Sequence, residues 1–378
     1  MPEQHAVLSA SSSKMWMSCP PSAQLNAAAN DTPSEYARQG TAAHLWAEMK
    51  VKRILGQNLK DPTDGAEYYD AEMAECTDSY AQYVSEQIER AKQRCSDPIV
   101  LVEQRVDFSR WVPGGFGTAD MVIVSDDVLS IIDLKYGAGI PVDAENNSQM
   151  MCYALGALEF FDGIYDIGKI SMTIFQPRRE NISVYEISKA ELLEWADTKL
   201  APAAELASKG EGEFHAGEHC RFCKVKATCR KRAEYNLELA QYDFKMPDVL
   251  EDAEIEMILS KVDDLVSWAS DIKEYALLQA VNGKQWNEWK VVEGRSNRKY
   301  TDEGLVADKV KNAGFDPYEH KILGITAMTK LLGKNKFEDL LGGFIEKPKG
   351  KPTLVPMSDK RPALSKAADA ADDFKEEI

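Results

Sequence analysis

The chain has 378 residues, which is long enough for one full hydrophobic core and a smaller second unit. Its hydrophobic fraction of 44% and charged fraction of 28% are ordinary for a globular protein and exclude a chain that cannot form a core. The net charge of -17 argues against a generally basic, DNA-coating protein, but it is compatible with an enzyme that holds cations with carboxylates and keeps a local basic groove.

The sequence contains no apolar stretch near the ~18 residues that a membrane helix needs, so we expect no membrane partner. The N-terminus has no basic segment followed by an apolar run, so we expect no secretory signal and a cytoplasmic location. In that reducing compartment the seven cysteines are expected as thiols or metal ligands rather than as disulfides.

Helical and strand-like patterns alternate over residues 1–235. Helical periodicity and capping residues predict helices over 34–57, 65–95, 144–161 and 188–209. Clusters of β-branched residues between turns predict strands over 99–108, 117–125, 128–136, 169–177 and 182–188. This order predicts an α/β domain over residues 1–235, with a mixed central sheet flanked by helices.

The remaining third of the chain carries no motif that we can connect to chemistry. Amphipathic periodicity predicts one long helix over 250–282, and shorter helices follow around 302–314 and 326–342. The segment WKVVEG at 289–294 is a candidate strand. We therefore expect a mainly helical accessory region over 236–343 and a disordered tail over 344–378, which is rich in Lys, Pro and Asp.

Three segments carry a pattern with catalytic chemistry. Gly117-Thr-Ala-Asp120 begins the second predicted strand, Asp133-Leu-Lys135 ends the third, and a helix with Gln149 and Tyr153 follows. Alternate residues of a strand share a face, so Asp133 and Lys135 project together while Leu134 points into the core. If the two strands pair, Asp120 lies near Asp133, and two neighbouring carboxylates favour a cation such as Mg²⁺ or Mn²⁺ between them.

A single D-x-K is common and by itself fits a strand end with solvated charges. The order of these segments is much less common, and it resembles the RecB-like branch of the PD-(D/E)XK nucleases. The resemblance implies a restriction-endonuclease-like core in which Lys135 is catalytic. It further implies that Gln149 and Tyr153 position DNA. The metal ligands that it implies are Asp120, Asp133 and the backbone carbonyl of Leu134.

The same branch carries a histidine on an early helix, and Gly40-Thr-Ala-Ala-His44 fits that position. The resemblance makes His44 a further metal ligand, whereas a surface histidine satisfied on its own helix is the alternative. Glu103, on the first predicted strand, is a weaker candidate ligand, because strand glutamates are usually solvated.

Cys220, Cys223 and Cys229 form a C-x₂-C-x₅-C pattern, for which a metal site is expected, and Cys19 is the candidate fourth ligand. Spacing alone leaves Zn²⁺ and an iron–sulfur cluster open. Resemblance to AddB-type nucleases, which have the same order of cysteines, implies a [4Fe–4S] cluster that staples the domain. Basic side chains around the triplet fit either a solvated face or a contact with DNA phosphates; these are Arg221, Lys224, Lys226, Arg230, Lys231 and Arg232.

The chain as a whole resembles a family found in phages and prophages that is assigned to this nuclease superfamily. We therefore expect a Mg²⁺- or Mn²⁺-dependent deoxyribonuclease, with exonuclease action in phage DNA replication or recombination. DNA and phage replication or recombination proteins are the expected partners, and the oligomeric state is left open. Two alternatives are a catalytically inactive DNA-binding or scaffold subunit and a zinc-stabilised interaction protein with an accidental D-x-K.

Overall fold

The computed structural model describes residues 6–29, 34–63, 67–161, 163–238, 250–293, 300–318, 322–346, 354–355 and 359. The contacts divide the chain into two units, Met1–Gln279 and Ala280–Ile378, which are described separately. The tail expected over 344–378 lies mostly outside the described residues. None of the helices that are described is both long enough and apolar enough to cross a membrane.

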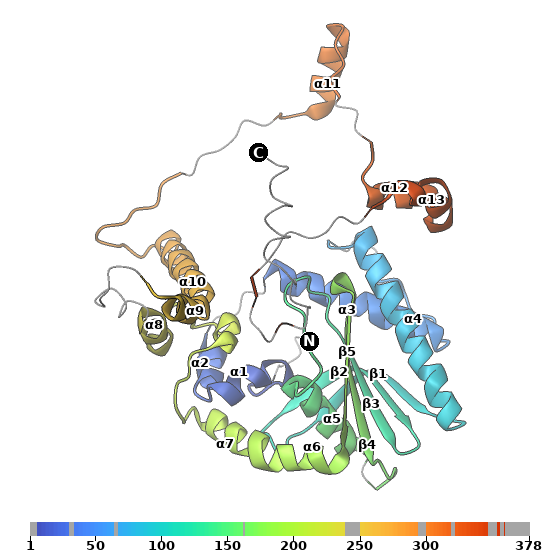
Figure 1. Cartoon of the computed structure of the whole chain (residues 1–378), viewed down its shortest axis with the longest axis vertical. Coiled ribbons are helices and arrows are strands. Elements are labelled where there is room, and N and C mark those ends of the chain that lie inside the picture. Colours follow the sequence, from blue (N-terminus) through green and yellow to red (C-terminus); the bar gives the residue numbers. More distant parts are fainter. Residues whose placement is uncertain are drawn as a thin grey trace. The chain divides into compact units, whose positions relative to one another are not determined.

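A mixed sheet with the strand order β1-β2-β3-β4-β5 forms the centre of the first unit (Figure 1). The strands are β1 Ile99–Asp107, β2 Phe116–Ser125, β3 Val128–Leu134, β4 Lys169–Gln176 and β5 Asn181–Ser188. Only β3 and β4 pair in parallel; the other neighbours are antiparallel. The helix α5 Ser148–Phe161 connects this parallel pair, because parallel strands need a crossover. The predicted α/β fold with a mixed sheet flanked by helices is confirmed.

Two long helices, α3 Glu35–Ile54 and α4 Ala71–Arg94, cover one face of the sheet. Ser34 and Asp70 cap their first turns by accepting hydrogen bonds from backbone N–H groups. Their apolar side chains pack on alternate residues of β2 and β3, including Ile123 and Leu134. This packing, through Ala47 and Val51, fixes the second half of α3 next to the strands that carry the predicted acids.

The opposite face of the sheet packs against α5 and a second set of helices. These are α1 Ser13–Ser18, α2 Ser22–Ala28, α6 Lys189–Trp195 and α7 Ala201–Lys209. Gly156 allows α5 to approach β1 closely, because a Cβ there would lie 2.9 Å from Cβ of Val106. The site-bearing start of α5 is therefore held against the sheet.

The predicted helix over 250–282 is divided into α9 Asp252–Leu259 and α10 Val262–Val281, with Ser260 and Lys261 between them. The helix α8 Arg230–Leu237 is joined to α10 by an ion pair between Arg232 and Asp271. Nζ of Lys226 lies 2.7 Å from Oδ1 of the same Asp271. By its contacts, α10 belongs to the first unit as far as Gln279.

The second unit contains the helices α11 Glu303–Asn312, α12 Ile325–Leu332 and α13 Lys334–Leu341. They agree with the helices expected around 302–314 and 326–342. The expected strand at 289–294 is wrong for 289–293, which have no regular secondary structure, and residue 294 lies outside the described part. A β-branched run forms a strand only where another strand is available to pair with it.

Candidate functional site

Three acidic residues lie in a row across the first three strands of the sheet. Glu103 and Asp120 lie between the β1–β2 pairs Val102↔Met121 and Gln104↔Ala119. The β2–β3 register, continued by one residue, places Asp133 opposite Asp120. Glu103 has a φ of 51°, in the left-handed region that non-glycine residues rarely adopt. Backbone strain of this kind is concentrated at functional sites, and here it falls beside the central acid.

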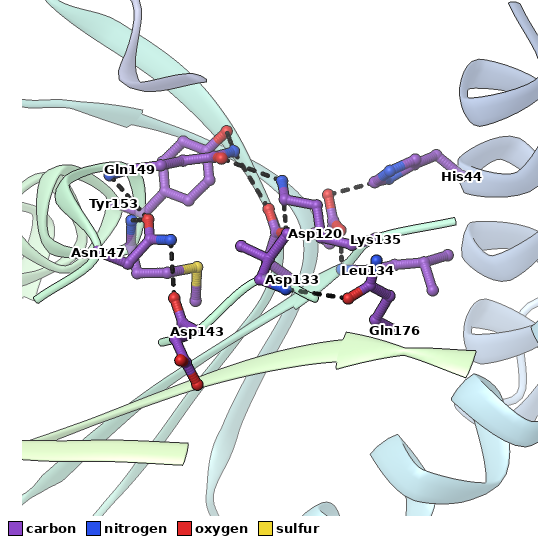
Figure 2. Close-up of polar contacts among 12 residues, drawn as sticks. His44, Asp120, Asp133, Leu134, Lys135, Asp143, Asn147, Gln149, Tyr153 and Gln176 are labelled. Carbon is purple, nitrogen blue, oxygen red and sulfur yellow. Dashed lines mark hydrogen bonds and ion pairs between the residues drawn. The ribbon is translucent and has the colours of Figure 1, made fainter. Parts of the chain in front are cut away.

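Asp120 contacts both His44 and the end of the strand that carries Asp133 and Lys135 (Figure 2). Its Oδ2 accepts a hydrogen bond from the backbone N–H of Leu134 at 2.7 Å. Its Oδ1 lies 3.2 Å from Nδ1 of His44. His44 belongs to α3, one of the two helices that cover the sheet. The side chain of Leu134 is buried in the core, as its place between Asp133 and Lys135 predicted.

The second half of the site is a network around Asp133, whose side chain is 2% exposed. Its Oδ2 lies 2.7 Å from Nζ of Lys135, and its Oδ1 accepts a hydrogen bond from Nε2 of Gln149 at 3.3 Å. The ammonium of Lys135 also donates to Oε1 of Gln149 at 3.0 Å. Burial raises the pKa of Asp133, the Lys135 ammonium opposes that rise, and the Asp120 carboxylate adds to it.

The start of α5 fixes Gln149 and Tyr153 in this network. Oδ1 of Asn147 accepts the backbone N–H of Gln149 at 3.1 Å, as an N-cap residue does. Nε2 of Gln149 donates to Oη of Tyr153 at 3.0 Å. A Cβ on Gly117 would lie only 2.7 Å from the Tyr153 ring, so the glycine of the predicted Gly-Thr-Ala-Asp segment makes room for this tyrosine.

His44, Glu103 and Asp120 form a group whose ligand atoms all lie within 4.8 Å of one another. Burial lowers the pKa of His44, but the Asp120 carboxylate outweighs burial and raises the pKa to about 9. Burial, followed by repulsion from Asp120, raises the pKa of Glu103 to about 8. One nitrogen and two carboxylates at this spacing are a donor set that can hold a divalent cation.

Two residues that the sequence did not single out also shape the site. Tyr80 of α4 lines the same pocket as His44 and Glu103, and burial raises the pKa of its hydroxyl. The buried side chain of Gln176 donates to the carbonyl of Gly137 at 2.8 Å and fixes the chain that follows Lys135. Neither residue carries a sequence signal, because a helix tyrosine and a glutamine at a strand end are common in cores and at surfaces alike.

The four predicted cysteine ligands come from two distant segments that the structure brings together. Cys19 follows α1, whereas Cys220 lies in the 3₁₀ helix η4 Glu218–Phe222, with Cys223 and Cys229 after it. A hydrogen bond between Cys19 and His219 raises the pKa of that histidine. From the N-terminal side, Asn26 of α2 donates to Sγ of Cys223 at 3.4 Å and accepts from the N–H of Lys224 at 2.7 Å.

Two of the six basic residues around the cysteines pair with a buried acid. Arg232 is 4% exposed and pairs with Asp271, and Lys226 pairs with the same carboxylate. The local sequence did not predict that Asp271 of α10 pairs with these two positive charges. Arg221, Lys224 and Arg230 are exposed.

Two comparisons place the chain among known proteins. A solved structure described as "Crystal structure of SSO0001" is 14% identical to this chain, with a TM-score of 0.21, over 51% of this chain and 98% of that chain. A likeness at that TM-score supports no statement about a shared fold. A family model described as "Protein of unknown function (DUF2800)" matches residues 5–362. Because that match spans nearly the whole length, the chain belongs to the DUF2800 family.

Proposed function

We propose that this chain is a metal-dependent DNA nuclease with a RecB-like PD-(D/E)XK site. The observation that carries the proposal is the position of Asp120. One of its carboxylate oxygens contacts His44, and the other holds the backbone N–H of Leu134, between Asp133 and Lys135. A single residue therefore joins a candidate cation site to an acid–lysine pair, which is the combination that phosphodiester hydrolysis needs.

The donor atoms fit Mg²⁺ or Mn²⁺. His44, Glu103 and Asp120 would hold the cation, with Asp133 beside them and the Leu134 carbonyl proposed from the resemblance alone. The pKa of about 8 at Glu103 reflects its burial and the neighbouring Asp120 charge, both of which a bound cation would offset. A divalent cation in such a site lowers the pKa of a bound water and polarises a scissile phosphate.

The protein's own side chains perform the remaining tasks. The side chain of Lys135 is 28% exposed, so its ammonium is accessible to a phosphate while Asp133 and Gln149 hold it in place. In that position it stabilises negative charge that develops on the phosphate. Gln149 and Tyr153 hold each other by a hydrogen bond and form the α5 side of the site. Exonuclease action on phage DNA during replication or recombination is part of the proposal and is based on the resemblance.

A cleavage assay on end-labelled single- and double-stranded DNA tests this function. We expect cleavage that needs Mg²⁺ or Mn²⁺, stops with a chelator, and releases mononucleotides from an end. Asp120→Asn and Asp133→Asn should each remove it, whereas Asp127→Asn, in the exposed turn between β2 and β3, should not. Cleavage by Asp133→Asn at the wild-type rate would sink the assignment.

For the four cysteines we propose a [4Fe–4S] cluster that staples the N-terminal segment to the region after α7. Cysteine spacing alone leaves zinc and an iron–sulfur cluster open. The resemblance to AddB-type nucleases, which have the same order of cysteines, favours the cluster.

Iron and sulfide analysis of anaerobically purified protein tests the cluster. We expect about four of each per chain and loss of visible absorption in Cys223→Ser, while Cys95→Ser, a half-buried cysteine outside the group, should retain both. Stoichiometric zinc in a colourless protein would overturn the iron–sulfur proposal.

A further inference from the structure

Tyr80 has a buried hydroxyl without a partner beside the candidate cation site. The residue is 2% exposed, and in the part of the chain that the structure describes its Oη makes no hydrogen bond. It lines the pocket that also contains His44, Glu103 and Asp120. A buried hydroxyl without a partner is costly, and phenylalanine would fill the same core space. The hydroxyl therefore points to an acceptor that becomes available in a cation-bound state.

The candidate acceptors are the carboxylates that line the pocket with Tyr80, namely Glu48, Glu103 and Asp120, together with the nearby Asp133. Glu48 is paired with Lys52 of its own helix. Both oxygens of Asp120 are engaged, by Leu134 and His44. Oδ1 of Asp133 accepts a hydrogen bond from Gln149, whereas Oδ2 makes no hydrogen bond but is ion-paired with Lys135 at 2.7 Å. Glu103 differs, because it lines the same pocket as Tyr80 and, among the residues that the structure describes, its carboxylate makes no hydrogen bond or ion pair.

We propose that Tyr80 is a positioning residue that donates its hydroxyl hydrogen to the Glu103 carboxylate when that carboxylate binds a divalent cation. This inference rests on the proposed cation site. Carboxylates that bind metals are commonly oriented by a second hydrogen-bonding partner. Here the second partner is Tyr80, and its ring is held in place by packing against Phe175 at a centroid distance of 5.7 Å. Glu103, by contrast, has a backbone φ of 51°, in the left-handed region that non-glycine residues rarely adopt.

The test is Mn²⁺ binding to the full chain without DNA, measured by electron paramagnetic resonance for wild type and Tyr80→Phe. We expect the dissociation constant to rise about tenfold in Tyr80→Phe. The melting temperature of the metal-free variant should not fall, because only an unpaired hydroxyl is removed. The matched control is Tyr83→Phe, on the same helix with its ring 5.1 Å from the same Phe175 and outside the pocket, which should bind Mn²⁺ like wild type.

A double substitution tests whether the effect passes through Glu103. In a Glu103→Ala background, Tyr80→Phe should change the Mn²⁺ dissociation constant by less than about twofold. A full tenfold change in that background would overturn the pairing with Glu103. Equal Mn²⁺ affinity in wild type and Tyr80→Phe would overturn the inference and leave the nuclease proposal standing. A wild type that neither binds Mn²⁺ nor cleaves DNA would overturn both.

Discussion

Asp133 and Lys135 meet at the end of a buried strand, where the acid is nearly closed to solvent and the lysine is not. The lysine therefore compensates a buried carboxylate on one side and remains accessible on the other. The negative charge of Asp120 also raises the pKa of Asp133, and a cation bound at His44, Glu103 and Asp120 would reduce that effect. Substitution of the lysine should therefore affect cleavage without removing cation binding.

We expect Lys135→Met to reduce cleavage by about 10²–10³-fold, the usual effect of losing a group that stabilises transition-state charge. Mn²⁺ affinity should stay at or above the wild-type value, because lysine is not a ligand and its positive charge repels a cation. Steady-state cleavage and Mn²⁺ titration measure the two effects separately. Lys169→Met, which removes an exposed pair with Glu186, is the control and should change neither.

Cation binding should depend on pH through His44 and Glu103. Their pKa values of about 9 and about 8 mean that both are protonated at pH 7 in the metal-free protein. A cation must displace these protons, so its affinity should increase as the pH rises from 6 to 9 and level off above that range. Calorimetry at pH 7 in two buffers should detect about two protons released per Mg²⁺; a release near zero would contradict the ligand set.

At the scale of elements, the link between α8 and α10 is the clearest feature that the local sequence did not predict. Arg232 and Asp271 are both buried and pair directly, and Lys226 contacts the same carboxylate. Burial of Asp271 raises its pKa, but the two cations outweigh burial and lower it below the ordinary range. The charge arrangement therefore holds α10 beside the region of the cysteines.

Asp271→Ala should lower the free energy of unfolding by about 3–5 kcal/mol, because it leaves a buried arginine without its counter-charge. Denaturant titration followed by circular dichroism measures this loss. Glu234→Gln removes the exposed pair with Lys231 on the same helix α8, and it should cost no more than about 1 kcal/mol. Similar losses in the two variants would show that the Asp271 pair has no special structural role.

At the scale of the whole molecule, the division after Gln279 separates the unit with the sheet, the candidate cation site and the four cysteines from the rest. The α8–α10 ion pair lies entirely within that first unit. From the position of this pair, rather than from the end of the predicted motifs, we infer how much chain the sheet unit needs.

A chain ending at residue 293 should keep the wild-type melting temperature of the sheet unit and its DNA cleavage. A chain ending at residue 249 should melt lower, because it lacks Asp271 and leaves Arg232 unpaired. Differential scanning calorimetry and the end-labelled assay compare the two. Equal melting of both shortened chains would place the domain end near residue 235, as the sequence predicted.

The sequence by itself determined the strands, the flanking helices and the D-x-K geometry. Period-two alternation makes Leu134 face the core, and therefore makes Asp133 and Lys135 share the other side, in any sheet that buries this strand. The tertiary structure decided what short-range patterns do not encode. The β1–β2 register places Glu103 beside Asp120, the packing of α4 directs Tyr80 into the same pocket, and α10 supplies Asp271 to Arg232. Each of these contacts joins residues far apart in the chain, and the burial that shifts their pKa values exists only after the elements have packed.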